Sequence, residues 1–333
     1  DLMMGLVGSE MCIRDRLQPL VSVVIPVKNG IDTLKSCLDG IFSQSVANKM
    51  EVIVIDSGST DGTLELLANY PVRLINLPPK EFNHGDTRNL GVELARGEFV
   101  VMTVQDATPA NPDWIETMLQ HFDDPEVAAV CGQQIVNHDK LKNPLQWFRP
   151  ASEAKPYSVQ FNNPADFKSL SGKQQHSYCN WDDVNAIYRK TIKEKFPFRR
   201  LMFSEDTLWA KDALEAGYKI VYDYRARVYH YHHQNYKFYF KRSYIILYQN
   251  YKFYGYIKWP KNPILQMARV KMRLLKMKEL GMREKIHWAF YNFILIRAAW
   301  AAVLIFSNNA WFRGMKGVES SQKYFVGYPP QGI

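Results

Sequence analysis

The sequence predicts an α/β fold built around a mainly parallel central sheet. Four apolar runs rich in valine and isoleucine alternate with segments of helical spacing, and they lie at 21–27, 51–56, 72–77 and 98–104. Continuous apolar runs of this kind are typical of parallel strands that helices cover on both faces. The chain has 333 residues, 47% of them hydrophobic and 23% charged, which suffices for one large α/β domain with an appendage.

The remaining elements of the predicted domain, which covers 20–235, are assigned by apolar spacing. The polar stretch 137–175 has no clear period, and a loop of that length is usually functional or poorly ordered. The other segments are expected in this order: helices at 31–44, 61–69, 86–96 and 113–122, a strand at 127–136, helices at 184–195 and 204–217, and a strand at 219–230.

Residues 1–19 are left out of the predicted domain. The segment GLVGSEMCIRDR has no hydrophobic period and is similar to translated sequencing-adapter read-through, so a non-native extension is expected. A short signal peptide is the alternative, but no continuous apolar segment or Ala-x-Ala site supports it. The four cysteines have no paired spacing, which indicates core thiols in a reducing compartment.

Charge sets the last third of the chain apart. From 225 to 333 there are 19 Lys and Arg against three Glu, whereas the rest holds 23 basic and 30 acidic residues. We expect a helical extension over 236–333 whose basic segment 261–285 attaches peripherally to an anionic membrane surface. The apolar run 286–306 could span a bilayer by length, but Arg297 near its centre favours an interfacial or domain-packed helix. No nucleic-acid motif accompanies the interleaved basic and aromatic residues, so nucleic acid is not an expected partner.

Polar motifs follow three of the predicted strands at the point where each strand ends. They are Lys28-Asn29, Asp56-Ser57 and Gln105-Asp106. In open parallel sheets the ligand binds outside the carboxyl ends of the strands. These motifs are therefore expected to meet at one edge of the sheet and to form the binding site there.

Six blocks carry a resemblance to a known family. In order they are VSVVIPVKNG, EVIVIDSGSTDGT, EFNHGDTRNLGVELARGE, VVMTVQDATPANPDW, the run from FPF to SEDTLWAKDALEAGYKI, and VYHYHHQNYKFYFKR. Over about 20–245 the chain resembles the family 2 glycosyltransferases, which have a GT-A fold. It looks most like their rhamnosyltransferase branch, which has Gln-Asp-Ala where other members have Asp-x-Asp and which has an F-x-H-G block. Both occur here, at Gln105–Ala107 and Phe82–Gly85.

The resemblance implies an inverting glycosyltransferase of bacterial surface polysaccharide (O-antigen) synthesis. It would transfer L-rhamnose from dTDP-L-rhamnose to a polyprenyl-diphosphate-linked glycan at the cytoplasmic face of the cell membrane. A UDP-sugar-dependent member of the same family is one alternative. A catalytically silent binding or scaffold protein with the same fold is another, although Asp106 and Asp206 are intact.

The resemblance also assigns residues to the nucleotide sugar. Asp56 would accept the ring N–H of the pyrimidine, or it is a turn residue that binds its own backbone. Arg88 would approach the nucleotide, or it is a surface residue paired with Asp86 or Glu93. The full predicted set is Pro26, Val27, Asp56, Ser57, Asp61, Arg88, Gln105 and Asp106, with Asp61 also explained as a helix start and Gln105 as a candidate for sugar hydroxyls.

Asp106 is the expected ligand of a divalent metal ion, Mg²⁺ or Mn²⁺, that would neutralise the leaving diphosphate. One carboxylate is a poor metal site on its own. Strand alternation puts His230 and His232 on one face, so they are the candidate additional ligands. The alternative is that both are interface histidines at an aromatic-rich strand end.

Asp206 is the expected catalytic base. The resemblance implies that it removes the proton of the acceptor hydroxyl. Glu205 and Asp206 also suit the first turn of any helix, because the helix dipole favours acidic residues there. The predicted sugar and acceptor pocket consists of His84, Gly85, Glu205 and Trp209, with Trp209 alternatively a core residue.

Overall fold

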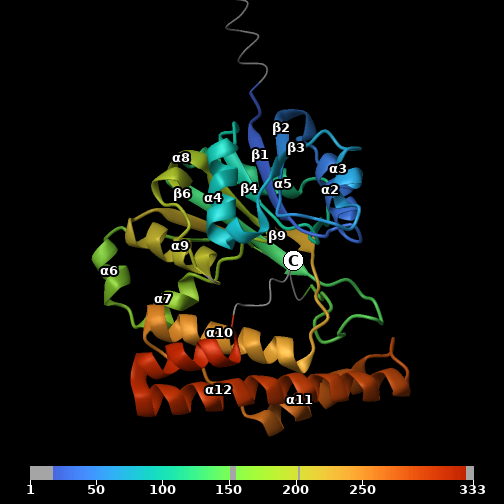
Figure 1. Ribbon diagram of the computed structural model, residues 1–333, viewed down its shortest axis with the longest axis vertical. Helices are drawn as coiled ribbons and strands as arrows, with labels where there is room; N and C mark the ends of the chain where they lie inside the picture. Colours follow the sequence, from blue (N-terminus) through green and yellow to red (C-terminus); the bar gives the residue numbers. More distant parts are fainter. Residues whose placement is uncertain (1–17, 151–154, 202, 328–333) are drawn as a thin grey trace, which may run out of the picture.

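The computed structural model describes residues 18–150, 155–201 and 203–327. The predicted non-native segment lies almost entirely outside these residues. Figure 1 shows two parts: a sheet with helices on both faces, and a layer of three long helices below it. The last strand of the sheet, β9, ends at Tyr229 and the first helix of the lower layer begins at Tyr236, so that end of the sheet lies close to the helical layer.

Nine strands form one sheet in the order β3-β2-β1-β4-β8-β6-β9-β5, and β7 pairs with β9. The β3-β2-β1-β4 half of the sheet is parallel. Next to it, β8 runs antiparallel to both β4 and β6, and β6 pairs in parallel with β9. The α/β prediction is therefore confirmed, with the parallel region confined to two parts of the sheet. The strands are β1 (Val21–Val27), β2 (Met50–Asp56), β3 (Arg73–Asn76), β4 (Phe99–Met102), β5 (Thr108–Pro109), β6 (Val127–Ile135), β7 (Tyr157–Val159), β8 (Ala186–Arg189) and β9 (Lys219–Tyr229).

Helices cover the two faces of this sheet. Along β1, alternate side chains pack to opposite sides: Val23 and Ile25 join one core with Leu38 of α2, and Val24 joins the other. Both cores are closed to solvent, which explains the unbroken apolar run of this strand. The helices are α2 (Leu34–Phe42), α3 (Thr63–Leu67), α4 (His84–Leu94), α5 (Trp114–Leu119), α6 (Pro164–Ser169), α7 (Gly172–Tyr178), α8 (Lys190–Lys195) and α9 (Glu205–Glu215).

Two segments differ from the sequence prediction. The segment 184–195 is expected to be helical, but only its second half is, as α8; its first half forms the strand β8. Its apolar spacing fits a helix, but a short apolar run does not distinguish the two, and β8 gains ladder hydrogen bonds on both sides. The polar stretch 137–175 contains β7, α6 and the start of α7, which are too short to produce a visible period.

The lower layer consists of α10 (Tyr236–Tyr254), α11 (Pro263–Lys276) and α12 (Met282–Phe325). Phe306 of α12 packs against Tyr244 and Tyr251 of α10, with ring centroids 5.4 and 5.8 Å apart. The helical hydrogen-bonding of α12 runs across a non-helical residue, Gly314, with φ 57°. Within the described residues α12 is the one helix that has the length and apolar composition of a membrane span.

Candidate active site

The carboxyl ends of β1, β2 and β4 meet at one edge, as the sequence predicts, and Gln105 fixes that edge. Its amide oxygen accepts from the Lys28 N–H at 2.9 Å, and its amide nitrogen donates to the Lys28 carbonyl at 3.1 Å. A Cβ on Gly30 would lie 2.8 Å from the same amide oxygen, so glycine leaves the space that Gln105 fills. Gln105 is buried, and both ends of its amide are engaged with the backbone rather than open to a sugar hydroxyl.

The loop after β2 is braced by its own polar side chains. The Asp56 carboxylate accepts from the N–H groups of Gly58 and Ser59 at 2.9 and 3.0 Å, which is the turn arrangement given as its alternative. The Ser57 hydroxyl donates to the Val27 carbonyl at 3.1 Å, and Asp61 accepts from the Ile31 N–H at 3.2 Å. These contacts tie the β2 loop to the end of β1 and leave Asp56 at the predicted edge.

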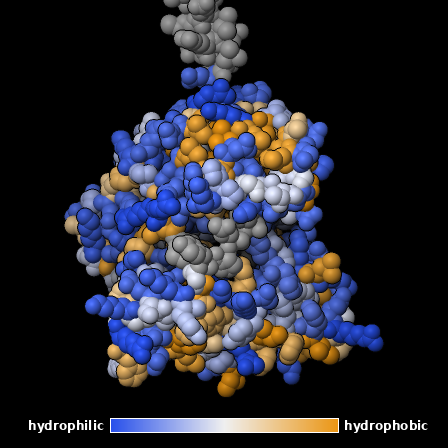
Figure 2. All heavy atoms as spheres, in the orientation of Figure 1, coloured by the Kyte–Doolittle hydropathy of each residue, from blue (hydrophilic) through white to orange (hydrophobic). Residues whose placement is uncertain are grey.

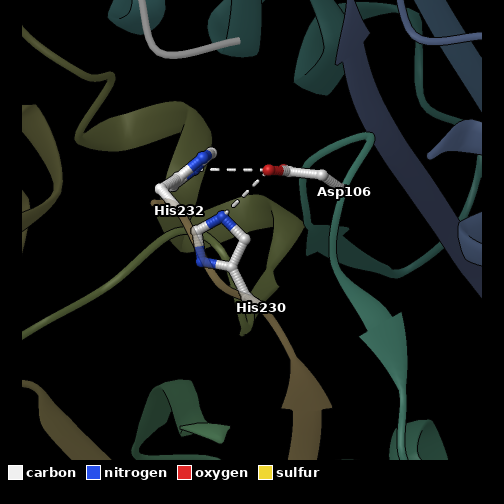
Figure 3. A group of neighbouring side chains, drawn as sticks. All are labelled: Asp106, His230 and His232. Carbon is white, nitrogen blue, oxygen red and sulfur yellow. Dashed lines mark ion pairs between the residues drawn. The ribbon is translucent and has the colours of Figure 1, made fainter. Parts of the chain in front are cut away.

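Asp106 lies between two histidines, His230 and His232, that come from the end of the domain along the sequence. We call these three residues the Asp106 triad. The Asp106 carboxylate oxygen Oδ2 is 3.3 Å from Nε2 of His230 and 3.3 Å from Nε2 of His232. Figure 3 shows the three side chains converging, with Asp106 after β4 and both histidines after β9. One ligand atom from each residue lies within 4.8 Å of the others, so the triad could hold a metal ion.

A hydrogen-bonded glutamine orients one of these histidines. Gln134 of β6 donates through its amide nitrogen to the Asp182 carboxylate. Its amide oxygen therefore faces His230 Nδ1 at 2.6 Å, and that nitrogen must carry the proton. The lone pair of His230 is left on Nε2, the atom directed at Asp106, which is the tautomer a metal ligand needs.

A second group of charged side chains consists of Arg88, Asp183, Glu205 and Asp206. We call this group the Arg88 cluster. Arg88 is buried and donates through Nη1 to Glu205 at 2.6 Å, while its Nε is 3.6 Å from an Asp183 oxygen. The guanidinium is therefore engaged by carboxylates 95 and 117 positions away. Neither Asp86 nor Glu93, the local partners that the sequence suggested, is involved, and Asp86 pairs instead with Arg200.

Asp206 is the carboxylate of this cluster that is still partly exposed. It accepts from the backbone N–H of Thr207 at 2.7 Å and from that of Asp183 at 3.4 Å. Burial, together with the nearby charges of Glu205, Asp183 and Asp182, raises the pKa of Asp206 well above its usual range. A carboxylate with a raised pKa is a stronger base, as general base catalysis requires.

The F-x-H-G block acts on Asp206 indirectly. Asn83 caps α4 and donates to the Leu201 carbonyl at 2.8 Å, while Asn89 exchanges two hydrogen bonds with the Phe198 backbone. A Cβ on Gly85 would lie 2.6 Å from the Arg199 carbonyl, so glycine permits this contact. The block holds the segment that leads into the first turn of α9, where Asp206 lies. Burial, together with the Arg88 charge, lowers the pKa of His84 at the start of α4.

Two predicted pocket residues are enclosed rather than open. Trp209 is 1% exposed and packs on Trp181 and Tyr188, which is the core alternative and not an acceptor platform. Glu205 is buried on Arg88. Sequence reasoning missed Gln134, Asp182 and Asp183. Gln134 follows the apolar start of β6, just as Gln105 follows the apolar strand β4. This shared pattern is the sequence signal from which Gln134 could have been identified.

The fold and the two clusters define a nucleotide-sugar glycosyltransferase of the GT-A type. The model of glycosyl transferase family 2 matches residues 22–194. The chain belongs to this family.

Among curated proteins, the chain is 32% identical over 217 residues to the O-antigen chain rhamnosyltransferase RfbN of Salmonella typhimurium. It is also 32% identical over 222 residues to the O-antigen chain rhamnosyltransferase WbaN of Salmonella anatum. Each match covers 64% of this chain, and 66% and 67% of the two relatives. Among solved structures, S. aureus TarS 1–349 has a TM-score of 0.54 at 16% identity, with 93% of this chain and 81% of that chain covered, which shows the shared fold.

Proposed function

We propose that this protein is an inverting rhamnosyltransferase that transfers L-rhamnose from dTDP-L-rhamnose to a lipid-linked glycan of bacterial O-antigen synthesis. Rhamnose and the O-antigen chain are inferred from the two Salmonella relatives, which are named O-antigen chain rhamnosyltransferases. The dTDP carrier and the lipid-linked acceptor are inferred from the resemblance to the rhamnosyltransferase branch. The reaction type is inferred from the site. Work on a lipid-linked acceptor implies a peripheral location on the cytoplasmic face of the membrane.

Asp206 would act as the catalytic base. The acceptor hydroxyl oxygen attacks the anomeric carbon from the face opposite the diphosphate, and its proton passes to the Asp206 carboxylate. The bond between the anomeric carbon and the diphosphate oxygen breaks, which releases the nucleoside diphosphate and inverts the anomeric centre. The raised pKa of Asp206 helps it to accept that proton at the moment of attack.

The Asp106 triad fits a divalent ion such as Mg²⁺ or Mn²⁺. It offers one carboxylate and two imidazoles within 4.8 Å, and Gln134 fixes the His230 tautomer with Nε2 free. Burial, with help from His230 and Arg242, lowers the pKa of His232 against the pull of Asp106, so its imidazole is neutral and able to bind. A bound divalent ion would supply positive charge to the departing diphosphate.

The observation that carries this proposal is the position of the Asp106 triad at the carboxyl ends of the strands, with the carboxylate of Asp206 in the neighbouring cluster. The hydrogen-bond path from His230 through Gln134 reaches Asp182, whose charge acts on Asp206. A donor site and a base held in one framework suit transfer between two bound substrates. A scaffold protein has no need of a base whose pKa is raised by burial.

The test is a transfer assay with the purified full chain, a lipid-linked glycan acceptor and a panel of dTDP-, UDP- and GDP-sugars. We expect transfer of rhamnose from dTDP-L-rhamnose, its loss in EDTA, and recovery with Mn²⁺ or Mg²⁺. Asp106→Asn should abolish the metal response, and Asp166→Asn, at an exposed carboxylate of α6, is the matched control. Transfer only from UDP-sugars would refute the proposal that dTDP-L-rhamnose is the donor. No transfer from any donor would refute the proposal that the protein is an active glycosyltransferase.

A further inference from the structure

Helix α11 has two apolar faces, and only one of them is used inside the protein. Val270 and Leu274 are buried in the core beneath the helix. Ile264, Ala268, Met272 and Leu275, spaced i, i+4, i+8 and i+11, form a second apolar face that is exposed to solvent. Ile264 is 77% exposed and Leu275 is 55% exposed. A stable soluble helix needs no such second face.

The start of α12 repeats this pattern. Met282, Ile286, Phe290 and Phe293 have the same i, i+4, i+8, i+11 spacing and are all exposed. The two helices lie antiparallel: the Trp300 indole donates to the Lys261 carbonyl, and the Lys285 ammonium donates to the Leu275 carbonyl, both at 3.3 Å. Figure 2 shows hydrophobic and hydrophilic residues mixed along the lower edge of the molecule, where Figure 1 places α11 and α12.

Basic side chains flank the exposed apolar face of α11. Every charged residue of the helix is basic, namely Arg269, Lys271, Arg273 and Lys276, and all four are exposed. Arg273 and Lys276 also line a hollow of about 170 Å³ together with Arg149, Met277 and one acidic residue, Glu279. Apolar side chains bordered by exposed cations match an anionic lipid surface. The apolar side chains would insert among the acyl chains, and the cations would be attracted to the headgroup phosphates.

Charge and packing decide between this surface and two other occupants. A second copy of the same face would bring its cations against those of the first, and the two would repel. A membrane span by α12 would require it to leave α10, because α10 carries Lys237, Lys241, Arg242 and Lys252 and cannot enter the acyl region with it. Lying in the membrane plane keeps the α10–α12 contact and uses only the exposed face.

We propose that α11 and the first half of α12 form a docking face that lies in the plane of an anionic membrane leaflet. The face is made of Ile264, Met272 and Leu275 of α11 and Ile286, Phe290 and Phe293 of α12. It deepens the proposed function by naming the surface that brings the enzyme to a membrane-borne acceptor. The docking itself does not depend on which sugar is transferred.

The test is flotation of the full chain with vesicles. Vesicles of phosphatidylethanolamine and phosphatidylglycerol should carry the protein, vesicles of phosphatidylcholine alone should carry much less, and high salt should weaken the binding. Ile264→Glu combined with Leu275→Glu should lower partitioning at least about tenfold. Leu74→Glu, at an exposed leucine of the edge strand β3, is the matched control and should float as the unsubstituted protein does.

Three results would overturn the docking face. The first is unchanged flotation of the double variant with an unchanged melting temperature. The second is retention in membranes after alkaline carbonate extraction, which would indicate a span. The third is a dimer in sedimentation that the double variant splits, without vesicle binding by the original protein. Normal flotation without any sugar transfer would refute the proposed function and leave the docking face intact, so the two failures are distinguishable.

Discussion

The protein gathers its functional charges in two neighbouring groups that differ in how far their interactions are already satisfied. In the Asp106 triad the Nε2 atoms of the two histidines each lie 3.3 Å from the Asp106 carboxylate, and all three side chains are partly exposed. In the Arg88 cluster the guanidinium is buried and already neutralised by carboxylates of the same chain. The first group has the arrangement that a bound cation would need, whereas the charges of the second group are balanced mainly within the chain, and they raise the pKa of Asp206, the proposed base.

The largest expected effect is on the one exposed member of the Arg88 cluster. Asp206→Asn should lower kcat by up to about 10⁴-fold, because the acceptor hydroxyl then loses its proton acceptor. KM for the donor should change little, since Asp206 is outside the triad. The measurement is steady-state transfer with Asp166→Asn as control. A variant that keeps more than a tenth of the activity would contradict the role given to Asp206.

Next in size is the structural part of the same cluster. Arg88→Met should cost about 3–5 kcal/mol of stability, because Glu205 and Asp183 would remain buried without their cation. Arg200→Ala breaks an exposed ion pair with Asp86 and should cost less than about 1 kcal/mol. Denaturant unfolding of both variants measures the contrast. Equal losses would mean that Arg88 is not the internal counter-ion.

A smaller effect tests the triad through a residue that touches no substrate. Gln134→Ala should weaken Mn²⁺ binding by about 10–100-fold, because His230 loses the hydrogen bond that fixes its tautomer. Gln133→Ala removes the preceding amide and should leave the affinity unchanged. Calorimetric titration with Mn²⁺ alone gives the result without an activity assay. Equal affinities for the two variants would remove Gln134 from its positioning role.

The smallest effect is a dependence of stability on pH. The pKa of Asp206 is raised in the folded protein, so the folded state binds the proton more tightly than the unfolded chain and stability falls as pH rises above about 4. Asp206→Asn should therefore melt higher than the unsubstituted protein at neutral pH, by about 2 °C. The gap should close as pH falls toward 4. A gap that widens in acid would reverse the assigned direction.

The meeting of the strand ends at one edge of the sheet could be predicted from the sequence, because that edge is built from local patterns. Val-rich strands end at Asp56 and at Gln105-Asp106, and parallel strands bring such ends together without further information. His230 and His232 each lie 3.3 Å from the Asp106 carboxylate. Their role as metal ligands stays a prediction.

The contacts of the Arg88 cluster could not be predicted from the sequence. Near Arg88 the chain offers Asp86 and Glu93, and nothing local signals that Glu205 is the partner. The same limit applies to β8, which is a strand because two neighbours offer it ladder bonds rather than because of its own four residues. Long-range pairing decides both cases, and it is a property of the assembled sheet.

The link between β9 and α10 has a mechanical consequence. It is six residues long, from His230 to Asn235, and it carries both histidines of the triad. If the helical layer docks on a membrane as proposed, a tilt of that layer would be passed through this short link to the imidazoles that face Asp106. Lengthening the link with flexible residues would then uncouple the position of the layer from the geometry of the triad.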